Sequence, residues 1–86
     1  MHEMSIALDV CRIAEERVGA DQVANVVTVG LDVGTDSGVE VENLRFCLDA
    51  LLTQPPFAQG QAVIACPVGD DLRVTYIEVD DGNPDD

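Results

Sequence analysis

The stretch from residue 22 to residue 33 constrains the fold more than any other part of the chain. Apolar side chains alternate there with small or polar ones, in the order Val27, Thr28, Val29, Gly30, Leu31, Asp32 and Val33. Alternation over this length is typical of a β-strand with one buried and one exposed face. The sequence therefore predicts a strand over residues 22–33 that needs a covering layer on its apolar side.

Residues 4–18 have the spacing of an amphipathic helix that can supply this cover. Their apolar side chains recur every three or four positions, at Ile6, Ala7, Val10, Cys11, Ile13, Ala14 and Val18. Such spacing places these side chains on one face of a helix. Ser5 is a suitable N-cap, a start nearer Glu3 is the alternative, and Gly19 is positioned to end the helix.

A turn-forming cluster at residues 34–38 precedes a second helix, which we expect from about residue 40 to residue 52. Its apolar stripe consists of Leu44, Cys47, Leu48 and Leu51, flanked by Val41 and Phe46. Asp36 or Ser37 can cap its start. Pro55 and Pro56 follow it, and proline ends helices because it lacks a backbone donor and restricts the preceding residue.

The last third of the chain contains two more strand-like segments, residues 61–66 and 72–79. The turn-forming residues 67–71 between them predict a hairpin. The complete order is helix, strand, helix, strand, strand. We therefore expect an α+β fold in which two helices pack on one face of a three-stranded sheet.

Length and composition suit one small domain. The 86 residues are 47% hydrophobic but include only one Tyr, two Phe and no Trp, so the core must be aliphatic. We expect residues 1–79 to form the domain and residues 80–86 to form an acidic flexible tail. The chain shows neither a signal peptide nor an apolar run that could span a bilayer, which indicates a cytoplasmic protein.

The charge balance excludes several partners. The chain has 17 acidic residues against four arginines, for a net charge of −13. Such a surface repels phosphate backbones and anionic lipid headgroups, so we expect neither nucleic-acid binding nor membrane binding. It instead favours cationic partners and divalent metals.

The cysteine and histidine inventory argues against zinc binding and against catalysis. Cys11, Cys47 and Cys66 form no CxxC pair, so the chain offers no zinc site, and all three lie in apolar runs where a reduced thiol behaves as a small hydrophobe. No nucleotide-binding glycine motif is present, and His2 is the only histidine. We therefore expect that the chain is not an enzyme.

The start of the chain, Met1-His2-Glu3, contains the groups that suit a metal site. The α-amine of Met1, the amide nitrogen of His2 and its imidazole can close fused chelate rings on one ion. Either the Glu3 amide nitrogen or the Glu3 carboxylate can complete the set. Nitrogen-rich planar sets suit Ni(II) or Cu(II), and the affinity should fall in mild acid because protons compete with the metal.

MHEMSIAL at the start of an amphipathic helix is similar to the opening of the HypA/HybF nickel-incorporation proteins. The resemblance continues through VVTVGLDVG, through GTDSGVEVENLRFCLDALL with its SGV turn, and into the closing DLRVTYIEVD. It thus spans nearly the whole chain except the acidic tail. Members of that family carry two CxxC pairs in a zinc-binding module between the last two strands, and this sequence has neither pair.

The resemblance implies a metallochaperone rather than an enzyme, one that serves the maturation of a [NiFe]-hydrogenase or a related metalloenzyme. It implies Ni(II) as the metal, Met1, His2 and Glu3 as its ligands, and a HypB-like GTPase and the hydrogenase large subunit as partners. Glu40 is a supporting carboxylate on this view, or simply an acidic residue favoured at a helix start.

The missing zinc module leaves an alternative. The chain can instead be a HypA-like adaptor or accessory subunit of a metalloenzyme complex that binds no metal. A short sheet with unpaired edges can also pair with a second copy, so a homodimer is a further arrangement open to it.

Overall fold

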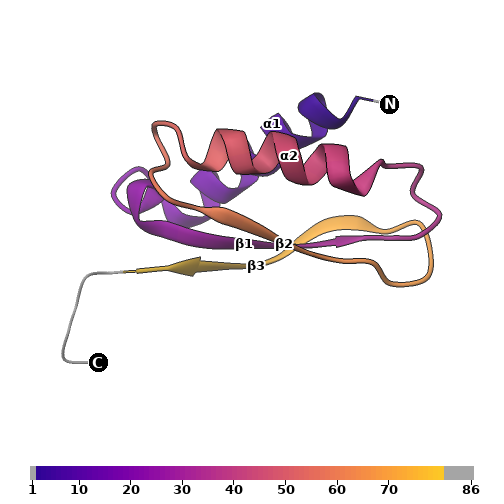
Figure 1. Ribbon diagram of the computed structural model, residues 1–86. Coiled ribbons are helices and arrows are strands. Elements are labelled where there is room, and N and C mark those ends of the chain that lie inside the picture. The colour runs from indigo at the N-terminus through magenta and orange to yellow at the C-terminus, as the bar shows by residue number, and fades with distance from the viewer. Residues whose placement is uncertain (1, 81–86) are drawn as a thin grey trace.

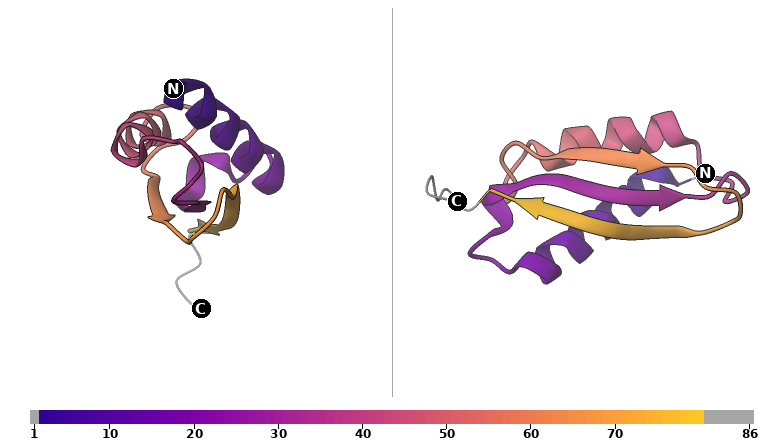
Figure 2. Two further views of the ribbon diagram at one scale, coloured as in Figure 1. Left: turned by 90° about the vertical axis from the view of Figure 1, so that its right-hand side faces the viewer. Right: turned by 90° about the horizontal axis from the view of Figure 1, so that it is seen from below.

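The computed structural model describes residues 2–80, in which two helices cover one face of a three-stranded sheet (Figure 1). The elements are α1 (Glu3–Val18), a single 3₁₀ turn (Val23–Asn25), β1 (Val26–Val33), α2 (Val41–Leu52), β2 (Gln61–Ala65) and β3 (Leu72–Val79). Figure 2 shows both helices on the same side of the sheet and the opposite side open. The predicted α+β fold and its element order are confirmed.

The predicted hairpin between the last two strands is wrong. The sheet order is β2-β1-β3, with β1 parallel to β2 and antiparallel to β3. The two strands therefore flank β1 and do not pair with each other. The connection through α2 is long enough for a parallel crossover, which places β2 at one edge. The segment 66–71 then crosses the end of β1 to reach the other edge.

Several predicted boundaries shift by a few residues. Helix α1 begins at Glu3, and the Ile6 N–H donates to the His2 carbonyl, so the earlier start is correct and Ser5 is not the cap. Gly19, at φ 84°, ends the helix as expected. Helix α2 is preceded by Glu40, which occupies its N-cap position in place of Asp36 or Ser37.

Strand β1 begins at Val26 rather than at residue 22. The register with β3 shifts between Val26 and Thr28, so that the residue between them, Val27, has no partner. This bulge places Val26, rather than Val27, on the buried face. From Thr28 onward Val29, Leu31 and Val33 are buried as predicted. The opposite face is not fully exposed as predicted, because Thr28 and Gly30 are buried as well.

The core is aliphatic, as the composition requires. The largest fully buried side chains are Val26, Val29, Leu31, Val33, Leu44, Leu48 and Leu52. The leucines recur every four residues along α2, so that helix buries a single stripe against the sheet. Phe46 lies away from this stripe and is 77% exposed. Fully buried Ala7 and Ala14 give α1 a small-residue face toward the core.

The Asp80 N–H donates to the Asn25 carbonyl at 2.8 Å, which fixes the end of β3 beside the start of β1. The expected acidic flexible tail, residues 80–86, otherwise lies outside the described residues. No helix within residues 2–80 combines the length and the apolar character that a bilayer crossing demands.

The three cysteines differ in exposure. The predictions that the strand extends to Cys66 and that its thiol packs as a small hydrophobe are wrong. Cys66 is exposed and follows the end of β2, whereas Cys11 is buried in α1 and Cys47 is half-buried in α2. Cys66 is exposed because it begins the crossover segment, which runs over the end of the sheet rather than into the core.

This difference predicts an order of thiol reactivity. Burial, together with the nearby Glu15 carboxylate, raises the pKa of the Cys11 thiol to about 11. Because the thiolate is the reactive form, we expect iodoacetamide at mild alkaline pH to alkylate Cys66 first and Cys11 only in denaturant. Mass spectrometry of the modified peptides measures the order. Rapid alkylation of Cys11 in folded protein would contradict its burial.

Candidate functional site

His2 stands at the exposed start of α1. It occupies the N-cap position with non-helical backbone angles, and its side chain makes no capping hydrogen bond. It borders a shallow hollow of about 350 Å³ that Asn43, Phe46 and Cys47 of α2 also line. The first amide groups of a helix have no acceptor within it, so the Glu3 amide nitrogen is not used by the helix ladder. Met1, the first predicted ligand, lies outside the described residues.

Glu3 is buried although it is charged, with only 7% of its surface exposed. Its Oε2 accepts a hydrogen bond of 3.0 Å from the Glu40 backbone N–H. The bond joins the start of α1 to the start of α2, where a negative charge also suits the helix dipole. The Glu3 carboxylate, one of its two groups considered as a metal ligand, therefore already accepts a hydrogen bond from the start of α2.

The structure brings Glu40 close to Glu3 through its backbone rather than through its side chain. Its carbonyl accepts the Leu44 N–H at 3.0 Å, and the residue as a whole is exposed. Within residues 2–80, no group of three or more His, Cys, Asp or Glu side chains is arranged to hold a metal ion. A metal site at this end of the protein would therefore depend on backbone nitrogens together with the His2 imidazole.

Two loops meet beside the start of α2, and sequence reasoning missed their contact. The N–H groups of Gly34, Thr35 and Asp36 donate to the carbonyls of Asp71, Pro67 and Gly69, at 2.6, 2.9 and 2.7 Å respectively. We call these three bonds the loop clamp. No local pattern signals it, because it joins segments more than 30 residues apart, and only the crossover of residues 66–71 over β1 brings them together.

The loop clamp gathers acidic side chains at one end of the molecule. Asp36, Glu40, Asp70 and Asp71 are all exposed, and their loops lie at the same end as the start of α1 (Figures 1 and 2). Like charges concentrated in this way raise the local concentration of cations. Four exposed carboxylates therefore lie at the end of the molecule that carries His2.

Comparison of the sequence with known proteins identifies a family. Residues 1–70 match the profile of a family described as hydrogenase/urease nickel incorporation, metallochaperone, hypA. The class of protein so defined is described as nickel-incorporation metallochaperones. The match covers most of the chain, and the chain belongs to the HypA family.

Individual relatives support the assignment. The chain is 47% identical over 60 residues to a hydrogenase maturation factor HypA from Albidiferax ferrireducens. The matched segment covers 70% of this chain and 52% of that protein. It is 43% identical over 60 residues to a HypA from Azotobacter chroococcum, with the same coverage, and 38% identical over 73 residues to one from Chlorobium phaeobacteroides. The chain thus spans about half the length of the first two relatives. No solved structure gives a significant match.

Proposed function

We propose that this chain is a nickel carrier that binds Ni(II) as cargo through the α-amine of Met1, the amide and imidazole of His2, and the amide nitrogen of Glu3. It would act in the cytoplasm, receive or pass on the metal with a HypB-like GTPase, and deliver it to a hydrogenase large subunit. The observation that carries the proposal is the position of His2, exposed at the N-cap of α1 in a chain of the HypA family.

The chemistry of the donor set supports nickel over other divalent ions. Four nitrogen donors in a plane suit Ni(II) or Cu(II), whereas Mg²⁺ and Ca²⁺ require oxygen ligands. The Glu3 carboxylate is bonded to the Glu40 N–H, which favours the Glu3 amide as the fourth donor. The exposed carboxylates of the two clamped loops would attract the cation without binding it directly.

Titration of untagged protein with Ni(II) is the direct test. With a free Met1 amine, we expect calorimetry to show about one ion bound per chain at micromolar concentrations. Binding should weaken as the pH falls, because the imidazole and the amides must be free of protons. Mg²⁺ is the control and should produce no comparable heat.

Absence of Ni(II) binding by folded protein at neutral pH would favour the second candidate, an adaptor that binds no metal. The exposed aromatic ring of Phe46 and the half-exposed Met4, both bordering the hollow beside His2, support that alternative. Exposed apolar side chains that lie together are typical of a docking surface.

A further inference from the structure

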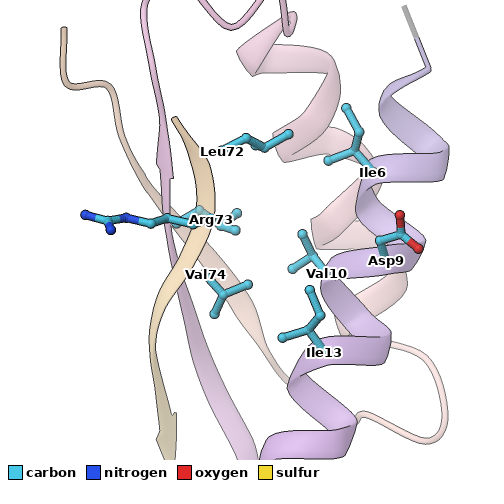
Figure 3. Close-up of a pocket in the computed structure, with 8 residues that line it drawn as sticks. Ile6, Asp9, Val10, Ile13, Leu72, Arg73 and Val74 are labelled. Carbon is cyan, nitrogen blue, oxygen red and sulfur yellow. The ribbon is translucent and has the colours of Figure 1, made fainter. Parts of the chain in front are cut away.

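An apolar cleft lies between α1 and β3 and shares no lining residue with the hollow beside His2. Figure 3 shows Ile6, Val10 and Ile13 of α1 facing Leu72 and Val74 of β3 across it. Its volume is about 200 Å³. Helix α1 covers β3 only partly, since Leu72 remains 41% exposed. Aliphatic side chains thus line an open space beside the edge of the sheet.

The outer edge of β3 borders this cleft and has no neighbour among the described strands. The sheet order β2-β1-β3 makes β3 an edge strand of eight residues. It contains neither proline nor lysine, two of the residues that commonly protect sheet edges from pairing. The N–H and C=O groups on its outer edge, on either side of a bulge at Thr75, can therefore accept another strand.

The side chains of β3 face inward and outward in an order that is the same from either end of the strand. Leu72, Val74, Ile77 and Val79 pair with buried residues of β1, so they face the helices. Arg73, Tyr76 and Glu78 pair with Asp32, Gly30 and Thr28 and face the open side. The Tyr76 ring lies where a Cβ on Gly30 would be. Thr75 is the extra residue of a bulge, and the bulge reverses the alternation between the two halves.

This symmetry allows β3 to pair with the same strand of a second copy. In an antiparallel pair with a two-fold axis between Thr75 and Tyr76, Leu72 lies opposite Val79, Arg73 opposite Glu78, and Val74 opposite Ile77. Every such pair faces the same side of the sheet. A shift by one residue would place inward side chains opposite outward ones, so this register alone matches along the whole strand.

We propose that β3 pairs with β3 of a second copy in this register and forms a continuous six-stranded sheet. Arg73 of each copy then lies opposite Glu78 of the other, which gives two opposite-charge pairs on the open face. Ile77 and Val79 of the second copy lie beside Val74 and Leu72 and fill the cleft under α1. The strand carries one positive and one negative charge, so pairing brings no excess of like charge into the contact despite the net charge of −13.

Sedimentation velocity of metal-free, untagged protein between about 1 µM and about 1 mM tests the proposal. We expect a species of twice the 9.2 kDa mass to form as the concentration rises. Each of Arg73→Glu and Glu78→Arg should weaken the dimer about tenfold or more, because each places like charges opposite each other at both symmetry-related positions. An equimolar mixture of the two variants should restore it, since both cross-strand pairs are then of opposite charge.

The mixture also controls for folding. Arg73 lies 3.6 Å from Asp32 within its own chain, so Arg73→Glu can lower stability, and the thermal midpoint of each variant is measured first. Restoration on mixing cannot come from misfolded chains. A wild type that stays monomeric to about 1 mM, or a mixture that associates no better than either variant alone, would overturn the proposal. Because no proposed nickel ligand lies on β3, these outcomes do not depend on metal binding.

Discussion

Replacing His2 with alanine is expected to lower the Ni(II) affinity more than about a hundredfold, which exceeds the tenfold to hundredfold loss typical of removing an outer-shell partner. The substitution removes the only imidazole in the chain and opens a chelate ring. One residue added before Met1 should have a similar effect, because it converts the primary amine into an amide and shifts it away from the ring. Calorimetry of the three untagged proteins under identical conditions measures the change.

Glu3→Gln is the matched control, because it changes the side chain of the next proposed ligand residue but keeps its backbone nitrogen, which is the proposed metal donor. The variant keeps the amide nitrogen and an acceptor oxygen for the Glu40 N–H. We expect nickel affinity close to that of the wild type and a loss of about 1 kcal/mol in folding stability, because a neutral acceptor replaces a charged one.

Two results would contradict this arrangement in different ways. If Glu3→Gln loses nickel as completely as His2→Ala, the carboxylate and not the amide is the fourth donor. If His2→Ala binds nickel normally, the proposed ligand set is wrong. If His2→Ala also supports hydrogenase maturation as well as the wild type in the host cell, the adaptor function becomes the better explanation.

Local patterns were sufficient for the element types but not for the pairing of strands. The spacing of apolar residues identified both helices, and Gly19 and the Pro55-Pro56 pair bounded them correctly. The apolar character of residues 61–66 and 72–79 is the same whether these strands pair with each other or with β1. The short connection between them suggested a hairpin, whereas the structure uses it as a crossover over the end of β1.

The surroundings of the candidate site could be predicted only in part, for a related reason. His2 was identified from its type and its position in the sequence. The burial of Glu3 could not be predicted, because its partner, the Glu40 N–H, lies 37 residues away and an acidic residue in a first helical turn is ordinarily exposed. The exposure of Cys66 was also missed, since the apolar run that contains it continues past the end of β2.

Gly34→Ala is expected to lower the free energy of unfolding by about 3 kcal/mol, since overpacking costs about 1–3 kcal/mol and each lost hydrogen bond about 1 kcal/mol more. A Cβ on Gly34 would overlap the Gly69 carbonyl and approach the Asp71 amide nitrogen to 2.8 Å. Both are backbone atoms held by the loop clamp, so neither can rotate away as a side chain could. Because Gly34 does not have a positive φ, the backbone of alanine is not strained there. The cost comes from the collision and from the hydrogen bonds that it breaks.

Gly19→Ala separates this steric effect from the general cost of replacing glycine. Gly19 has φ 84° and ψ 161°, a backbone region that essentially only glycine adopts, and open space where a Cβ would lie. Alanine there meets strain but no collision, at about 1–3 kcal/mol. Each kcal/mol lowers the melting temperature of a domain of this size by about 4–8 °C, which calorimetry resolves. Gly34→Ala should also speed hydrogen exchange at Thr35 and Asp36, whose N–H groups complete the clamp. The opposite outcome is that Gly34→Ala loses less stability than Gly19→Ala and that the Thr35 and Asp36 amides stay protected. The crossover segment would then move aside for the Cβ, and the loop clamp would not fix this end of the protein.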